Sequence, residues 1–145
     1  MLSSWPVLAT RDTIALQTPV LCSVVTYLGH MIAVIFEVWP AEGETDRYLD
    51  LAAALRPTLE GMDGFISVER FRSITDPEKL LSLSFWRDEE AVRAWRNSTQ
   101  HRATQAKGRA GVFKDYHLRI ASVVRDYGMT ERDQAPDDSR AAHGG

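Results

Sequence analysis

The side chains best suited to chemistry lie in one stretch of the sequence, residues 79–109. This stretch contains Trp95, whose ring could hold a flat ligand, and His101, six residues further along. Histidine titrates near neutral pH, so His101 is a natural proton donor or acceptor. In an unbroken helix the two side chains would point about 120° apart. They can meet only if the helix breaks between them.

Such a break is predicted by the residues that separate them. Asp88 is a good helix N-cap, and apolar side chains follow it at helical spacing. The polar residues 97–99 then interrupt the pattern, and Asn97 with Gln100 three residues later resembles a capping box. We therefore expect the helix to break at Asn97 and to restart, running to about Gly108.

Other aromatic and histidine side chains are further candidates. Ring surfaces could come from Trp86, Phe36 and Phe85, and His117 stands on the predicted last strand. Each candidate also has a structural interpretation, because a tryptophan on an amphipathic helix is often core packing and a lone histidine is often a surface residue. No glycine-rich phosphate loop follows a strand. The four histidines do not have the sequence spacing of metal ligands; they are His30, His101, His117 and His143.

Composition limits the classes of function. The 145 residues, 44% hydrophobic and 26% charged, are typical of one soluble globular domain. The net charge of −3 argues against nucleic acid as a partner. The single cysteine, Cys22, excludes an intrachain disulfide, so we expect a reducing, cytoplasmic location. Five arginines should form a solvated face that could also meet an anionic substrate: Arg87, Arg93, Arg96, Arg102 and Arg109.

The hydrophobic pattern predicts six elements. Strands are expected at 31–39, 65–72, 80–86 and 113–127, and helices at 45–59 and, with the break, at 88–108. The first helix should be capped by Thr45. The second strand should place Phe65 with Glu69 and Phe71 on one face, and Val68 with Arg70 on the other.

This order of elements indicates an α+β, ferredoxin-like fold, βαββαβ, with both helices on one face of an antiparallel sheet. The opposite face still carries apolar side chains, and no further helix is available to cover it. A second copy of the chain should therefore pack against it, which predicts a homodimer.

Three segments are expected. Residues 1–30 should be an N-terminal extension, loosely ordered or upstream of a natural start at Met31, with an extra strand or helix over the sheet as the alternative. They have no basic leader and no apolar run of bilayer length, so neither a signal peptide nor a membrane span is expected. Residues 31–129 form the predicted domain, and residues 130–145, which lack periodicity, a disordered tail.

Five segments of residues 31–129 together resemble the antibiotic biosynthesis monooxygenase (ABM) domain family. They read MIAVIFEVWP, DGFISVERF, LLSLSFWRDEEAVRAWR, HRATQAKGR and DYHLRIASVVRDYG. The resemblance implies a dimeric α/β barrel built from ferredoxin-like subunits. It also implies, for some members, a monooxygenase that needs no bound cofactor and acts on a small aromatic molecule.

Such an oxygenase lets the substrate supply the electrons. An electron-rich phenol, anthrone or quinol-like molecule is deprotonated, and its anion reduces oxygen. The protein must provide an aromatic pocket, a base and dry walls. On this interpretation His101 and Trp95 are the catalytic residues. The substrate would be held by Phe36, Trp86, Phe85 and His117.

Two alternatives remain open. Haem-degrading members of the family carry an asparagine on the first strand and a histidine late in the second helix. Here the matching positions are Phe36 and a residue near Gln105, so haem ranks below the cofactor-free interpretation. The other alternative is a non-catalytic dimeric domain that binds an aromatic ligand. A titratable group at the inner end of the pocket would favour the enzyme.

Overall fold

The computed structural model describes residues 30–143, so the expectations for residues 1–29 and 144–145 fall outside the described part. The elements in chain order are β1 (Ile32–Pro40), α1 (Thr45–Glu60), β2 (Phe65–Arg72), β3 (Leu80–Trp86), α2 (Glu89–Arg96), α3 (Thr99–Lys107), the π-helical turn η1 (Gly108–Val112), β4 (Phe113–Ser122) and α4 (Asp137–His143).

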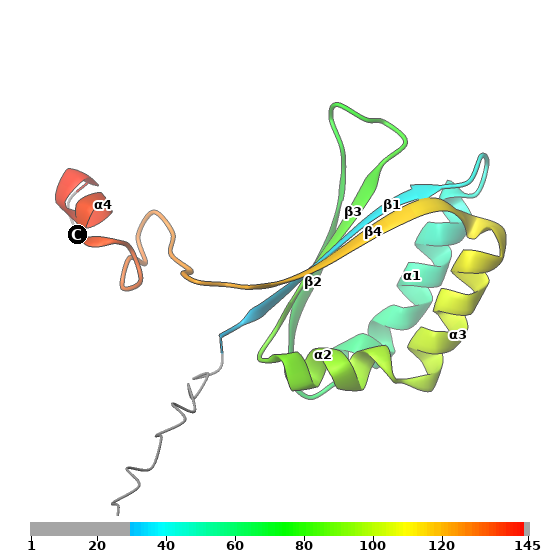
Figure 1. Ribbon diagram of the computed structural model, residues 1–145, viewed down its shortest axis with the longest axis horizontal. Coiled ribbons are helices and arrows are strands. Elements are labelled where there is room, and N and C mark those ends of the chain that lie inside the picture. Colours follow the sequence, from blue (N-terminus) through cyan, green and yellow to red (C-terminus); the bar gives the residue numbers. More distant parts are fainter. Residues whose placement is uncertain (1–29, 144–145) are drawn as a thin grey trace, which may run out of the picture.

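The four strands pair in one antiparallel sheet with the order β2-β3-β1-β4. The central strand β1 places Ile35 opposite Leu83 of β3 and opposite Arg119 of β4. The helices α1, α2 and α3 all lie on one side of this sheet (Figure 1). The predicted α+β, ferredoxin-like fold is therefore confirmed, with the second helix divided into α2 and α3.

Alternation along the strands decides which side chains meet the helices. Val38 of β1 is fully buried and Trp86 of β3 is 1% exposed, and both lie on the helix side. Two apolar clusters result. The cluster that joins the sheet to α2 and the end of α1 contains Ile32, Leu59, Trp86, Ala91 and Val92. The cluster that joins it to the start of α1 and to η1 contains Val38, Tyr48, Leu80 and Val112.

Strand β2 departs from simple alternation. The register with β3 shifts between Phe65 and Ser67, which marks a β-bulge at Ile66. As a result Phe65 packs edge-on against Trp86, with 5.4 Å between ring centroids, on the same side as Val68 and Arg70. The predicted grouping of Phe65 with Glu69 and Phe71 is therefore wrong, because the bulge inserts one extra residue and reverses the faces.

The first helix differs in one detail. Glu44 occupies the N-cap position and makes no capping hydrogen bond through its side chain, whereas Thr45 is the first helical residue. The prediction that Thr45 caps the helix is wrong by one position. Pro57 lies in the last turn and removes one backbone donor, but the helix continues past it to its end at Glu60.

The second helix breaks where the polar residues interrupt its pattern. Asp88 caps α2 by accepting a hydrogen bond from the Ala91 amide at 2.8 Å, as predicted. Helix α2 ends at Arg96, and α3 begins at Thr99. The capping side chain of α3 is Ser98 and not Asn97, because Asn97 is already the C-cap of α2.

The end of the chain differs from the prediction. Strand β4 stops at Ser122, not Tyr127; its partner β1 begins at Ile32, and one further bond joins the Val123 amide to the Met31 carbonyl at 2.8 Å. The chain then leaves the sheet and forms the short helix α4 within the stretch expected to be disordered (Figure 1). Asp137 at its start and Arg140 one turn later form an ion pair at 2.7 Å that suits the helix dipole.

The side of the sheet opposite the helices carries an apolar surface, which we call the open face. Its residues follow from the strand register and are Ala33, Ile35, Leu81, Leu83 and Phe85. On this face Glu37 of β1 forms two ion pairs, one with Arg119 of β4 and one, at 3.3 Å, with Lys79, which directly precedes β3. Within residues 30–143, none of the helices α1, α2 and α3 covers this face (Figure 1). In that same range, no helix has both the length and the apolar character needed to cross a bilayer.

Candidate functional site

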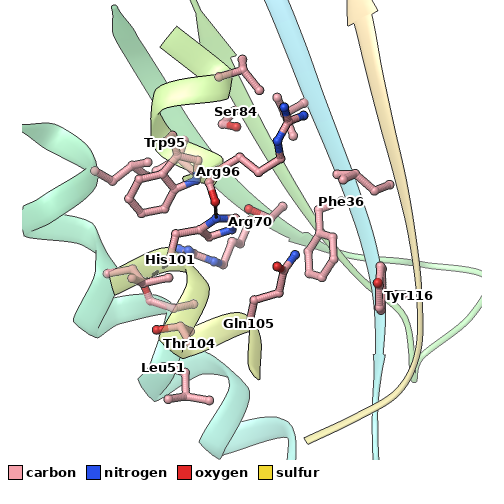
Figure 2. A pocket seen from close by; sticks show the side chains of 18 of the residues that line it. Phe36, Leu51, Arg70, Ser84, Trp95, Arg96, His101, Thr104, Gln105 and Tyr116 are labelled. Atoms are coloured by element: carbon pink, nitrogen blue, oxygen red, sulfur yellow. Dashed lines mark hydrogen bonds between the residues drawn. The ribbon is translucent and has the colours of Figure 1, made fainter. Parts of the chain in front are cut away.

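A cavity of about 190 Å³ lies between the helix side of the sheet and helices α1 and α3. Figure 2 shows Trp95 and His101 on one side of it, Phe36 and Tyr116 on the other, and Arg70 between them. Most of the remaining wall is aliphatic and includes Val34, Leu51, Leu55, Val68, Leu118 and Ile120. A wall of this kind excludes water and suits an apolar ligand.

Trp95 and His101 meet face to face in this wall. Their ring centroids are 4.8 Å apart and the ring planes differ by 28°. Trp95 also stacks on the buried ring of Trp86 at 6.2 Å and 30°. The three rings form a column that runs from the core to the cavity, so the position of the imidazole is set by packing.

His101 is oriented by a backbone group of α2. Its Nδ1 lies 3.4 Å from the carbonyl oxygen of Arg96. Because a carbonyl oxygen can only accept, Nδ1 must carry the proton, and Nε2 keeps the lone pair in the neutral ring. Burial lowers the pKa of His101 below its ordinary value, and the Arg96 carbonyl opposes this effect. The neutral ring, able to accept a proton, is thus the form at neutral pH.

The bend between α2 and α3 is braced by side chains. The amide of His101 donates to Ser98 Oγ at 3.3 Å. Asn97 Nδ2 donates to the Arg93 carbonyl at 3.0 Å, and Arg102 donates to Asn97 Oδ1 at 2.5 Å. These polar groups satisfy both helix ends at the break, so the angle that brings His101 onto Trp95 is fixed by local hydrogen bonds.

The facing wall is an aromatic group formed by β1, β4 and α1. Phe36 lies 5.6 Å from the Tyr116 ring and 5.8 Å from Phe113. Phe113 also meets Tyr48 edge-on at 6.0 Å. Burial raises the pKa of Tyr48, while the neighbouring guanidinium of Arg70 acts in the opposite direction. The phenol is therefore neutral at physiological pH.

The site also contains a positive charge from β2. Arg70 lines the cavity and donates to the Ala52 carbonyl at 3.5 Å. Its Nε is shielded from solvent and has no hydrogen-bond partner in the described part of the chain. Among residues 30–143, no aspartate or glutamate lines the cavity.

The structure brings only some of the predicted site residues together. His101, Trp95 and Phe36 line the cavity. Trp86 lies behind Trp95 as part of the core. Phe85 and His117 do not line the cavity, because alternation turns Phe85 away from Trp86 and places His117 opposite Glu37 on the open face. We therefore withdraw the substrate-binding roles predicted for Trp86, Phe85 and His117.

Sequence reasoning missed most of the polar lining. Arg96 was assigned to a solvated face, and Arg70 was not considered as a site residue. The signal for Arg70 was present, since an arginine on the same face as Val68 is unusual on a strand that packs against helices. Further polar lining comes from Ser82, Ser84, Thr104, Gln105 and Tyr116.

The residues present fit haem poorly. The cavity is smaller than the roughly 300–1,000 Å³ of ordinary ligand pockets, and a porphyrin needs more room than a drug-sized ligand. The positions matched to the haem-binding residues hold Phe36 and Gln105, neither of which is an iron ligand. Within residues 30–143, no cluster of three or more histidine, cysteine or acidic side chains is arranged to hold a metal ion.

Comparison with known proteins gives a consistent family. Residues 31–107 match the sequence profile described as antibiotic biosynthesis monooxygenase. The chain is 50% identical over 94 residues to the jasmonate monooxygenase ABM of Pyricularia oryzae; the match covers 65% of this chain but 44% of that protein. It is 31% identical over 93 residues to the uncharacterized protein YqjZ of Bacillus subtilis, covering 64% of this chain and 79% of that protein.

Solved structures agree on the fold. SnoaB of Streptomyces nogalater, a cofactor-independent oxygenase, superposes with a TM-score of 0.60 at 10% identity, covering 67% of this chain and 96% of that chain. A conserved protein of Methanosarcina mazei gives a TM-score of 0.60 at 17% identity, covering 64% and 92%.

Proposed function

The chain belongs to the antibiotic biosynthesis monooxygenase family, and on that premise we propose that it oxidises a small, largely apolar molecule with molecular oxygen and without a bound cofactor. The observation that carries the proposal is the neutral His101 ring. Its Nδ1 proton is engaged by the Arg96 carbonyl, so Nε2 is left to act as a base in an apolar wall.

The proposed reaction starts from a CH2 group made acidic by a neighbouring carbonyl or phenol ring. His101 takes one proton, and the carbanion transfers one electron to O2. The two radicals combine to a peroxide anion, which takes the proton back from His101. Loss of water then leaves a carbonyl group. The sum is CH2 + O2 → C=O + H2O, so the substrate supplies all the electrons.

The walls support this chemistry in two ways. An aliphatic and aromatic lining keeps water away from the carbanion, which would otherwise be reprotonated. The Trp95 ring fixes the plane of His101, so the base does not need to be ordered when the substrate binds. These features favour an enzyme over a domain that only binds a ligand, because binding alone does not need a half-buried, oriented base.

The substrate is expected to be small. The cavity of about 190 Å³ favours one or two rings over a polycyclic molecule. The relative from Pyricularia oryzae is named for jasmonate, and this chain spans less than half of its length. Jasmonate therefore joins naphthols and hydroquinones as a candidate substrate, whereas the three fused rings of an anthrone exceed this size.

We further propose that the protein is a homodimer in which a second copy covers the open face. The apolar residues Ile35, Leu83 and Phe85 lie there on neighbouring strands. Burying them against the same face of another copy would remove this apolar surface from water.

The test is oxygen uptake by metal-stripped protein with each candidate substrate. We expect uptake above the substrate's own autoxidation, its loss in His101→Ala, and its retention in His117→Ala. The control is matched because His117 is exposed and lies on the other side of the sheet. Equal uptake in His101→Ala would remove His101 from the mechanism. No uptake with any substrate would contradict the proposed function.

A further inference from the structure

We propose that Arg70 anchors a carboxylate group of the ligand, so that the cavity selects small apolar monocarboxylic acids over neutral molecules of the same shape. The inference rests on the proposed function for the reaction that follows binding, although the binding step can be measured separately.

The guanidinium of Arg70 lacks a counter-charge among the described residues. Its Nε is out of contact with solvent and has no hydrogen-bond partner within residues 30–143. The bond from Nη2 to the Ala52 carbonyl, at 3.5 Å, is long, and the side-chain partner of the guanidinium is the phenol of Tyr48, which is neutral. Among residues 30–143, no carboxylate forms an ion pair with Arg70. A partly desolvated charge of this kind is unfavourable until an anion reaches it.

Other arginines of the chain show what a paired guanidinium looks like here. Arg87 binds both carboxylate oxygens of Asp63, at 3.0 and 2.7 Å, and Arg56 meets Glu60 at 2.7 Å. Acidic residues are thus available on the surface, yet none lies in the wall of the cavity within the described residues. The acidic neighbour in sequence, Glu69, alternates to the opposite side of β2.

The charge in the cavity also favours a carboxylate. Two cationic side chains line it, Arg70 and the more exposed Arg96, while His101 is neutral. The half-buried guanidinium of Arg70, set in an apolar wall, matches one negative charge, and its planar fork of donors matches a carboxylate.

The position of Arg70 also suits a ligand with an apolar body. Arg70 lies between the His101 side of the cavity and the Phe36 side (Figure 2). A carboxylate held there leaves the body of the ligand against the rings of Trp95, Phe36 and Tyr116. The anchored end then fixes which carbon of the body approaches His101.

The experiment compares acids with their methyl esters. Binding of 2-naphthoic acid and jasmonic acid, and of the methyl ester of each, is measured by calorimetry under nitrogen. We expect the wild type to prefer each acid by roughly 10- to 100-fold, the range for a charge-assisted hydrogen bond. The preference should vanish in Arg70→Met, fall in Arg70→Lys, and persist in Arg72→Met. Arg72 is a matched control because it lies on the same strand but is exposed and bonds to the Pro77 carbonyl.

Thermal unfolding adds a readout independent of the ligand. Arg70→Met should unfold at the same or a higher temperature than the wild type, because it removes an unmatched charge. An acid preference that survives in a folded Arg70→Met protein would overturn the inference, as would equal binding of acid and ester, or binding of neither, in the wild type. Acid-selective binding without oxygen uptake would support the inference while contradicting the proposed function.

Discussion

The imidazole of His101 stacks on the indole of Trp95 at 4.8 Å, although six residues separate them along the chain. A continuous helix would point these side chains in different directions. The break at Asn97 and Ser98 turns α3 back so that the two rings share one wall. The chemistry proposed above depends on this bend.

The pH dependence of activity should report the burial of His101. Burial lowers its pKa below the ordinary value of 6.5, and the neutral form is the active base. The acid limb of kcat/KM should therefore have its midpoint below pH 6.5, with more than half of the plateau rate left at pH 6.5. NMR titration of the His101 ring should give the same midpoint. A midpoint at or above 6.5 would contradict the buried, neutral base.

The same shift links folding stability to pH. Between the lowered pKa and 6.5 the unfolded chain binds more protons at this position than the folded chain, so stability falls as the pH is lowered through that window. This loss should be absent in His101→Gln, measured by urea unfolding at several pH values. His117→Gln serves as the control.

Removing the cap of α3 should loosen the site. In Ser98→Ala the His101 amide loses its acceptor at 3.3 Å, and we expect a loss of about 1 kcal/mol in unfolding free energy. The rate of oxygen uptake should fall as well, because the base is held less firmly. Ser98→Asp keeps an acceptor at the helix start and should restore most of the stability. A Ser98→Ala protein as stable and active as the wild type would contradict the role of the cap.

A side chain at Gly108 should push the Phe113 ring out of its place in the cavity wall. A Cβ at this position would overlap the ring of Phe113, which packs on Phe36 and Tyr48. Gly108→Ala should therefore destabilise the fold by about 1–3 kcal/mol and weaken ligand binding, since the Phe113 ring must move.

Gly128→Ala is the matched control for this substitution, because nothing lies within 4 Å of a Cβ there. Thermal unfolding and calorimetric titration of both variants give the comparison. Equal stability of the two variants would show that the Phe113 ring yields without cost.

A charge on the open face should separate the proposed dimer. Leu83 lies near the middle of that face, opposite Ile35. Leu83→Glu would place a carboxylate from each copy into an apolar interface, so light scattering should report the mass of one chain. Leu49→Glu, on helix α1, should keep the mass of two. A wild-type mass of one chain, or an unchanged mass for Leu83→Glu, would contradict the dimer.

Much of the fold could be predicted from local patterns. A continuous apolar, β-branched run identified β1, and period-two alternation identified the other three strands of the sheet. Asp88 and the polar residues after Arg96 marked where α2 begins and where it breaks. The faces of β2 could not be predicted, because the bulge at Ile66 arises from pairing with β3 and leaves no local signal. The assignment of Phe85 and His117 to the site was wrong for a different reason: local alternation does not say which face of β3 and β4 meets the helices, and packing places both residues on the open face.

The sequence by itself determined the order of the elements from β1 to β4, the family, and the break between α2 and α3 that changes the direction of the His101 side chain. These depend on residues close together in the chain, where caps and hydrophobic periodicity act. Only the tertiary structure decided that Arg70 of β2 and His101 of α3 share one cavity that no acidic residue of 30–143 lines. That outcome depends on how a bulged strand packs against a bent helix, which no local pattern encodes.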